Sequence, residues 1–202
     1  MLIDPETASI TEVYSTMIRA ITPRPIAWVS TISPTGITNL APFSYFSGTG
    51  SNPASLMFSV VNKADGTKKD TTRNIESSKE FVVNIVPYGI AESMLTTAGE
   101  FVYEESEFDV ASLTVKPSKR VAPPGVAESP IQLECELIQI VPIGEGPSAA
   151  NVVIGKILLF DIDDSVLDAD SKINPEKVDA IGRMGGRAYC KTRERFLINP
   201  AN

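Results

Sequence analysis

A succession of short, β-branched runs separated by turn signals limits the possible folds of this chain more than any other feature. Strand patterns are expected over residues 25–32, 37–47, 55–62, 81–86, 132–141 and 151–163. The stretch Ser33-Pro34-Thr35-Gly36 reads as a turn, because proline presets φ and glycine tolerates the left-handed region. No G-x-G-x-x-G occurs, and helical patterns do not alternate regularly with strands, so a doubly wound parallel sheet is not expected. The sequence therefore predicts a mainly β protein, an antiparallel barrel with a few short helices.

Helical patterns are few and short. Residues 9–19 place apolar side chains at helical spacing, and Ser9 with Glu12 three residues later has the form of a capping box. Residues 68–75 are predicted to be a loop entering a short helix, and residues 88–98 suit another helix.

The later part of the chain carries two patterns that are easily misread. Glu134 and Glu136 alternate with apolar residues, which predicts a half-exposed strand with these carboxylates on its solvent side. The run Ile143-Gly144-Glu145-Gly146-Pro147 is glycine-rich, but its proline and the lack of a following helix favour a hairpin loop over a phosphate cradle. Residues 181–198 are expected to form short extended pieces.

Composition and charge limit the class of protein. With 202 residues, of which 43% are hydrophobic, the chain can bury one sizeable core, so residues 1–202 are expected to form a single domain. A formal net charge of −7 argues against a nucleic-acid surface, and no apolar run is long enough to span a membrane. The N-terminus lacks the basic and apolar regions of a secretion signal, and Cys135 and Cys190 lie far apart, which favours a cytoplasmic protein with reduced thiols.

The chain contains no histidine at all. This absence removes the Ser-His-Asp triad, the Cys-His pair and most histidine-bearing metal sites, and two cysteines cannot complete a thiolate site. We therefore expect neither a metal site nor a catalytic side chain. If the protein is an enzyme, its chemistry is expected to belong to an organic cofactor.

The first candidate site lies within residues 30–47. Pro42 removes a ladder donor from a predicted strand and could leave backbone groups facing a flat, polar-edged ligand, with Ser44 and Tyr45 adding hydroxyl contacts. Trp28 and Phe46 could supply apolar walls. An edge strand with a bulge, its aromatic residues filling the core, explains the same pattern.

The second candidate site is a basic stretch within an acidic protein. Residues 63–73 hold four basic residues against two acidic ones, and Lys68 and Thr71 stand at a predicted helix start, where an anion can bind. Asp70 could equally be the helix cap, and the stretch could simply be a solvated basic loop.

Charge is also unevenly distributed along the rest of the chain. Residues 171–202 hold seven basic residues against three acidic ones, whereas residues 100–136 hold eight acidic residues against three basic ones. These segments could pair within a monomer or across a dimer, or both could be solvated faces. The acidic cluster Glu104-Glu105-Ser106-Glu107 is interpreted as a solvated loop.

Several ordered segments together resemble the flavin reductase-like family, which includes flavoredoxin-type proteins. The resemblance covers about residues 10–195 and is carried by residues 24–31, 36–46, 51–53, 68–75 and 81–84, with Arg183-Met184-Gly185-Gly186 and Tyr189 matching the family's tail. It implies the FMN-binding split β-barrel fold, a Greek-key-like antiparallel barrel, with FMN as the cofactor.

The resemblance also assigns candidate cofactor-binding residues. The segment along the isoalloxazine edge, which meets it largely through backbone atoms, corresponds to Asn39, Leu40, Ala41, Pro42, Ser44 and Tyr45. The ribityl-phosphate end corresponds to Ser30, Thr31, Lys68, Asp70 and Thr71. Arg183 and Tyr189 correspond to a tail that approaches the flavin, in some members from the neighbouring subunit of a homodimer.

The resemblance implies a function that needs no protein acid or base. A reduced nicotinamide, NADH or NADPH, would pass hydride to the bound flavin, which would reduce free flavin, oxygen or a redox partner. An FMN-binding electron carrier without nicotinamide turnover is the alternative from another class. A third is a non-catalytic domain that keeps the barrel.

Overall fold

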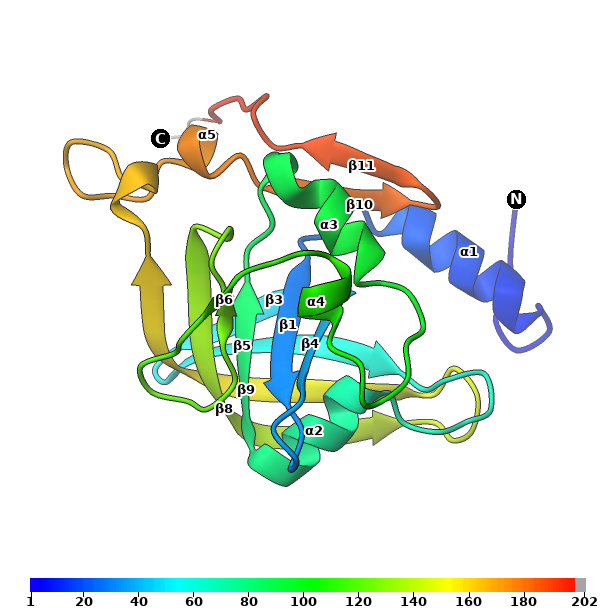
Figure 1. Ribbon diagram of the computed structural model, residues 1–202. Helices are drawn as coiled ribbons and strands as arrows, with labels where there is room; N and C mark the ends of the chain where they lie inside the picture. The colour runs from blue at the N-terminus through cyan, green and yellow to red at the C-terminus, as the bar shows by residue number, and fades with distance from the viewer. Residues whose placement is uncertain (199–202) are drawn as a thin grey trace.

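The computed structural model describes residues 1–198 and shows a mainly β protein built on one large antiparallel sheet (Figure 1). The strand order is β2-β1-β5-β8-β9-β4-β3, with every neighbouring pair antiparallel. Its strands are β1 (Ala27–Ile32), β2 (Thr38–Phe43), β3 (Phe46–Ser51), β4 (Ala54–Val61), β5 (Glu80–Asn84), β8 (Ile131–Ile143) and β9 (Ala150–Ile162). The predicted mainly β fold is confirmed.

Short elements complete the chain. Two small ladders pair β6 (Val115–Lys116) with β7 (Gly125–Val126) and β10 (Ile181–Gly185) with β11 (Ala188–Lys191). The α-helices are α1 (Ile10–Ala20), α2 (Asp70–Ser78), α3 (Ala91–Thr96), α4 (Glu107–Val110) and α5 (Pro175–Val178), with 3-10 turns at Tyr88–Ile90 and Asp164–Val166. Within the described residues, no helix is long and apolar enough to cross a membrane.

The large sheet coils around its core without closing. In Figure 1, β1 and β5 cross the direction of β4 and β9 at a steep angle. The long β8–β9 ladder carries register shifts between Glu134 and Cys135 and between Leu137 and Gln139, and such irregularities bend a sheet. Among residues 1–198 no ladder joins β2 to β3, so these two strands are the open edges of the sheet.

Aromatic side chains fill the concave side of the sheet. The ring of Phe58 lies 5.6 Å from that of Phe43 and 5.4 Å from that of Phe81, with all three side chains buried. A β-carbon at Gly155 would approach Cζ of Phe81 to 2.3 Å, so only glycine leaves room for this ring. The core therefore requires a glycine on β9.

A second apolar cluster lies on the other face of β1, under α3 and α4 (Figure 1). Trp28 is fully buried there beside Leu40, Met94 and Phe108. Its indole Nε1 donates a hydrogen bond to Oγ1 of Thr97 at 2.8 Å. This cluster holds α3 and the turn that follows it against strands β1 and β2, at one edge of the sheet.

Most of the predicted elements are confirmed. Ser9 caps α1, its hydroxyl accepting a hydrogen bond from the Glu12 N–H at 3.2 Å, and Ile143 and Ala150 flank the predicted β8–β9 hairpin loop. Residues 88–98 form a 3-10 turn followed by α3.

The predicted strand over residues 37–47 is wrong in one respect, because the chain turns at Ser44 and Tyr45 to form two strands, β2 and β3, on opposite edges of the sheet. The interruption expected at Pro42 is also absent, since the β1–β2 register runs unbroken through Trp28↔Pro42. The N–H of Leu40 points away from β1, donating to Glu107, and Pro42 follows two residues later with the same orientation. An edge strand therefore tolerates this proline without losing a ladder hydrogen bond.

Two smaller expectations about acidic residues are also corrected. Glu134 is buried rather than solvent-facing, and its carboxylate accepts the N–H groups of Lys119 and Arg120 at 2.9 and 2.6 Å. Asp70 is the first residue of α2 and not its cap; the cap position belongs to Lys69, which makes no side-chain capping bond.

Candidate functional site

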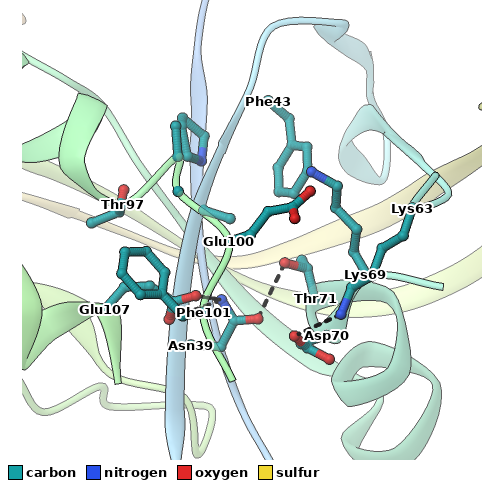
Figure 2. A pocket seen from close by; sticks show the side chains of 14 residues that line it. Asn39, Phe43, Lys63, Lys69, Asp70, Thr71, Thr97, Glu100, Phe101 and Glu107 are labelled. Carbon is teal, nitrogen blue, oxygen red and sulfur yellow. Dashed lines mark hydrogen bonds and ion pairs between the residues drawn. The ribbon is translucent and has the colours of Figure 1, made fainter. Parts of the chain in front are cut away.

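The candidate site is a groove along the open edge of β2, made of two adjoining hollows. The first has a volume of ≈ 180 Å³ and is lined by Asn39, Ala41, Lys63, Lys69, Thr71 and Glu107 among others (Figure 2). The second has ≈ 200 Å³ and is lined by Arg24, Ile26, Ser44, Met94, Arg183 and Tyr189 among others. Pro42, Phe43 and Ala98 line both hollows, so the groove continues from α2 to the β10–β11 hairpin.

The α2 end of the groove offers donors to an anion. Asp70 is engaged by Lys63 at 3.5 Å and by Arg73 at 3.0 Å, so its charge is matched. Lys69 forms no ion pair within residues 1–198, and Figure 2 shows its side chain directed across the hollow. The first N–H groups of a helix have no partner inside the helix, and here no side chain caps them. This end can therefore bind a phosphate-like group.

A chain of hydrogen bonds connects α2, β2 and α4 at the floor of the first hollow (Figure 2). Thr71 Oγ1 donates to Asn39 Oδ1 at 3.3 Å, and Asn39 Nδ2 donates to both carboxylate oxygens of Glu107 at 3.2 Å. The N–H of Leu40 donates to Glu107 Oε2 at 2.9 Å. These bonds hold three elements in one arrangement around the groove.

Burial dominates the electrostatics of Glu107. Desolvation raises the pKa of its carboxyl above the ordinary value, and the nearby charge of Asp70 acts in the same direction. The hydrogen bonds from Leu40 and Asn39 favour the ionised form and lower the pKa in part. Glu107 is thus more easily protonated than a solvated carboxyl.

The turn after α3 forms the opposite wall of the groove. Thr97 accepts the indole N–H of Trp28 and donates its own hydroxyl to the Met94 carbonyl at 2.8 Å, so the start of the turn is anchored in the core. Beyond it, residues 98–101 line the first hollow. A β-carbon at Gly99 would lie 2.9 Å from the Phe101 ring, so the turn needs a glycine to place that ring over the hollow.

At the other end, the β10–β11 hairpin brings Arg183 and Tyr189 to the groove. The Arg183 guanidinium lies 4.5 Å from the centre of the Tyr189 ring and donates to the Tyr189 hydroxyl. Ser44 accepts a hydrogen bond from Nε of Arg24 at 3.2 Å. Ser44 thus lines the same hollow as Arg183 and Tyr189, which lie far from it in sequence.

Several of the predicted site residues therefore line the groove, namely Asn39, Ala41, Pro42, Ser44, Asp70, Thr71, Arg183 and Tyr189. Leu40 lines neither hollow, because the whole residue is buried in the cluster around Trp28, with its N–H bonded to Glu107. Tyr45 lines a separate apolar hollow with Phe46 and Met57.

Ser30, Thr31 and Lys68 do not line either hollow. Ser30 and Thr31 are fully buried; the Ser30 hydroxyl donates to the Pro124 carbonyl at 2.5 Å, and the Thr31 hydroxyl accepts from Asn74 at 3.0 Å. Lys68 is exposed and pairs with Glu76 at 2.5 Å. The neighbouring Lys69, and not Lys68, lines the first hollow.

Sequence reasoning missed three contributors to the groove. Glu107 was grouped with a solvated acidic cluster, yet only Glu104 and Glu105 of that cluster are exposed acids. Arg24 lay in the matching motif, but nothing in the sequence showed that it would be buried. The wall formed by residues 97–101 carries no sequence signal beyond its glycine.

Comparison with known proteins places the chain in a class of flavin-linked oxidoreductases. The family model described as "Flavin reductase like domain" matches residues 18–177, and the chain belongs to that family. A protein of Aquifex aeolicus is 43% identical over 178 residues, covering 88% of this chain and 89% of its own.

Two solved structures are similar over nearly the whole length. Nitrilotriacetate monooxygenase component B from Bacillus cereus is 33% identical with a TM-score of 0.92, covering 98% of both chains. The 2-nitrobenzoate 2-nitroreductase NbaA of Pseudomonas fluorescens is 27% identical with a TM-score of 0.89, covering 100% of this chain and 96% of its own. Both names describe redox proteins.

Proposed function

We propose that the protein is an FMN-dependent oxidoreductase with the split-barrel fold, in which NADH or NADPH reduces a flavin bound along β2. The flavin would then reduce free flavin, oxygen or a redox partner. The observation that carries the proposal is the continuous groove, which has anion-binding groups at the α2 end and mixed polar and apolar walls along the open strand edge.

The donor set at the α2 end fits the phosphate of FMN. Lys69 and the uncapped N–H groups of α2 lie together at one end of the groove, beside Thr71, whose hydroxyl donates to Asn39. A helix N-terminus with a lysine beside it is a common arrangement for phosphate binding. Thr72, in the same first turn, carries the one buried side-chain oxygen without a hydrogen-bond partner among the described residues, but it is fully buried and does not line the hollow.

The edge of β2 fits a flat heteroaromatic ring. Since the N–H of Leu40 points away from β1, the carbonyl of Pro42, two residues later on the same strand, points away from β1 as well, and Pro42 lines both hollows. Such an acceptor suits a ring that carries an N–H group on its edge. Pro42 and Phe43 supply apolar surface shared by both hollows, and such mixed lining is typical of cofactor sites.

In this mechanism the flavin, when bound, supplies the two-electron chemistry. The chain binds the phosphate with Lys69 and α2, orients the ring with the edge of β2, and limits water with the Phe101 wall. The Thr71–Asn39–Glu107 chain holds these elements in place. Since hydride transfer to a flavin needs alignment and exclusion of water, these roles suffice without a protein acid or base.

We also propose that the protein is a homodimer. An apolar groove of ≈ 740 Å³ lies between α1 and the sheet, lined by residues that include Ile10, Val13, Met17, Val61 and Ile143. Ile10 is 70% exposed and Ile143 is 58% exposed, which is a large apolar surface to leave in water. A second copy covering it would remove this surface from solvent.

Anaerobic stopped-flow mixing of the FMN-loaded protein with NADH, and separately with NADPH, tests the reductase. Bleaching of the flavin band within seconds by one of them is expected. If FMN binds but neither nicotinamide bleaches it while dithionite does, the protein is an electron carrier. A protein that binds no FMN contradicts both.

A further inference from the structure

We propose that the hollow at the Arg24–Arg183 end of the groove binds the carboxylate of a small organic acid, which serves as a substrate or ligand beside the flavin. This inference rests on the proposed function, because it names a class of molecule that would meet the flavin at this end. It is carried by the arrangement of two arginines that have no acidic partner within residues 1–198.

The two arginines stand directly opposite one another. The N–H of Arg24 donates to the Arg183 carbonyl at 3.0 Å, and the N–H of Arg183 donates to the Arg24 carbonyl at 2.8 Å, forming an antiparallel bridge. Residues opposed in this way direct their side chains to the same face. Both side chains line the same hollow, and like charges so placed repel one another.

Arg24 is held only by neutral groups. The residue is 4% exposed, and Nη1 donates to the carbonyls of Ile18 and Ile21 at 2.6 and 2.7 Å. Nε donates to the Ser44 hydroxyl, and Nη2 makes no hydrogen bond within residues 1–198. A buried guanidinium is normally paired with a carboxylate, because burying an unpaired charge is costly. Arg24 therefore retains both a charge and donors for a ligand.

Arg183 likewise has no acidic partner in the part of the chain that the structure describes. It stacks on Tyr189 and donates to that hydroxyl and to the Gly186 carbonyl, and it forms no ion pair among the described residues. None of the side chains that line this hollow is acidic. The C-terminal end of α1 beside Arg24 supplies about half a negative charge, which is less than the positive charge of the two guanidinium groups. The net charge around the hollow is therefore positive.

The rest of the hollow indicates what kind of anion fits. Ile26, Phe43 and Met94 give it an apolar wall, and its ≈ 200 Å³ is below the range of about 300–1,000 Å³ for drug-sized ligands. A guanidinium binds a carboxylate through two parallel hydrogen bonds, which gives orientation as well as attraction. A small carboxylic acid with an apolar body matches these features better than an inorganic anion does.

Calorimetric titration of the FMN-loaded protein with benzoate and with benzamide tests this inference. Benzamide has nearly the same shape and no charge. We expect benzoate to bind at least about tenfold more tightly, and the Arg183→Gln variant to lose most of that preference. Arg187→Gln is the matched control, because Arg187 is exposed on the same hairpin and does not line the hollow; it should keep the preference.

Equal affinities for benzoate and benzamide in the wild type would overturn the proposal, as would an unchanged preference in Arg183→Gln. A third contrary result is a changed reduction potential of FMN in Arg183→Gln with the benzoate preference intact, since the arginines would then serve the flavin. The titration is repeated on FMN-free protein. A benzoate preference there, in a protein that takes up no FMN, would refute the proposed function but not the carboxylate site.

Discussion

The side-chain amide of Asn39 lies 3.2 Å from both carboxylate oxygens of Glu107, although 68 residues separate them. Through this contact and the Leu40 N–H, α4 is attached to the open edge of β2. Edge strands expose unpaired backbone groups, and Glu107 satisfies one that no neighbouring strand can reach. The groove depends on this attachment.

Glu107→Gln should therefore destabilise the fold and weaken FMN binding. Glutamine keeps one acceptor oxygen but brings an N–H₂ group toward Asn39 and Leu40, so at least one buried donor loses its partner. The cost is expected to be about 1–3 kcal/mol of unfolding free energy, measured by urea denaturation. Glu104→Gln, at an exposed position of the same segment, is the control and should change stability by less than about 0.5 kcal/mol.

The raised pKa of Glu107 also predicts a pH dependence. Below the ordinary value of 4.5 the carboxyl is protonated in both the folded and unfolded states, and its contribution to stability is fully present. As pH rises through the folded pKa, the folded state must hold a buried charge, so that contribution is lost. The stability of wild type relative to Glu107→Gln should thus fall as the pH rises above 4.5. A difference that is flat, or that rises with pH, would contradict the buried position of this carboxyl.

The choice between two adjacent lysines gives a sharp test of the phosphate end. Lys69→Ala should weaken FMN binding by about 1.5–3 kcal/mol, the range for a charge-assisted hydrogen bond, and should affect riboflavin, which lacks the phosphate, much less. Lys68→Ala is the matched control, since Lys68 pairs with Glu76 outside the groove. Fluorescence quenching of each flavin measures these affinities. Equal losses for FMN and riboflavin in Lys69→Ala would mean that Lys69 acts through folding.

Two glycines in the sheet should respond differently to the same substitution. Gly155→Ala forces a β-carbon to within 2.3 Å of the Phe81 ring, which is itself packed on Phe58, so about 1–3 kcal/mol of stability should be lost. Gly48→Ala meets no atom within 4 Å and should change stability little. Urea unfolding of both variants measures this. Adding Phe81→Leu to Gly155→Ala should recover part of the loss if the clash is its cause.

The wall of the groove can be tested through Trp28, the one tryptophan of the chain. Thr97→Val removes the acceptor of its buried indole N–H, which should cost about 1–3 kcal/mol and loosen the start of the turn over residues 97–101. Thr96→Val changes an exposed neighbour and serves as the control. Tryptophan fluorescence should shift only in Thr97→Val, and unchanged stability there would argue against this anchor.

The sequence predicted best what depends on local chemistry. The Ser9 cap needs only a hydroxyl three residues before Glu12, and the strands β4, β5 and β9 follow from segments rich in apolar and β-branched residues. Arg183 and Tyr189 line one hollow, and the sequence singles them out only through a family resemblance and not through any pattern in the residues themselves.

What the sequence could not predict depends on packing between distant segments. The chain turns at Ser44 and Tyr45 because β2 pairs with β1 whereas β3 pairs with β4. The sequence shows one continuous strand pattern here and does not indicate that its two halves pair with different strands. Lys68 and Lys69 are adjacent lysines, and only one of them lines the groove. Which one does so depends on where α2 begins, which is at Asp70. Glu107 is buried because α4 lies against β2, and an acidic run alone does not show this.

The central claim is that the groove along β2 is the flavin site, and Ala98 gives the most direct access to it. Ala98 lines both hollows yet is exposed, so Ala98→Trp should fill their junction without disturbing the core. Calorimetric titration of Ala98→Trp with FMN is compared with titrations of the wild type and of Ala169→Trp. Ala169 is an exposed alanine outside both hollows. One FMN per chain is expected for wild type and Ala169→Trp, with affinity at least about tenfold lower in Ala98→Trp at unchanged stability. Undiminished FMN binding by a folded Ala98→Trp would contradict the account.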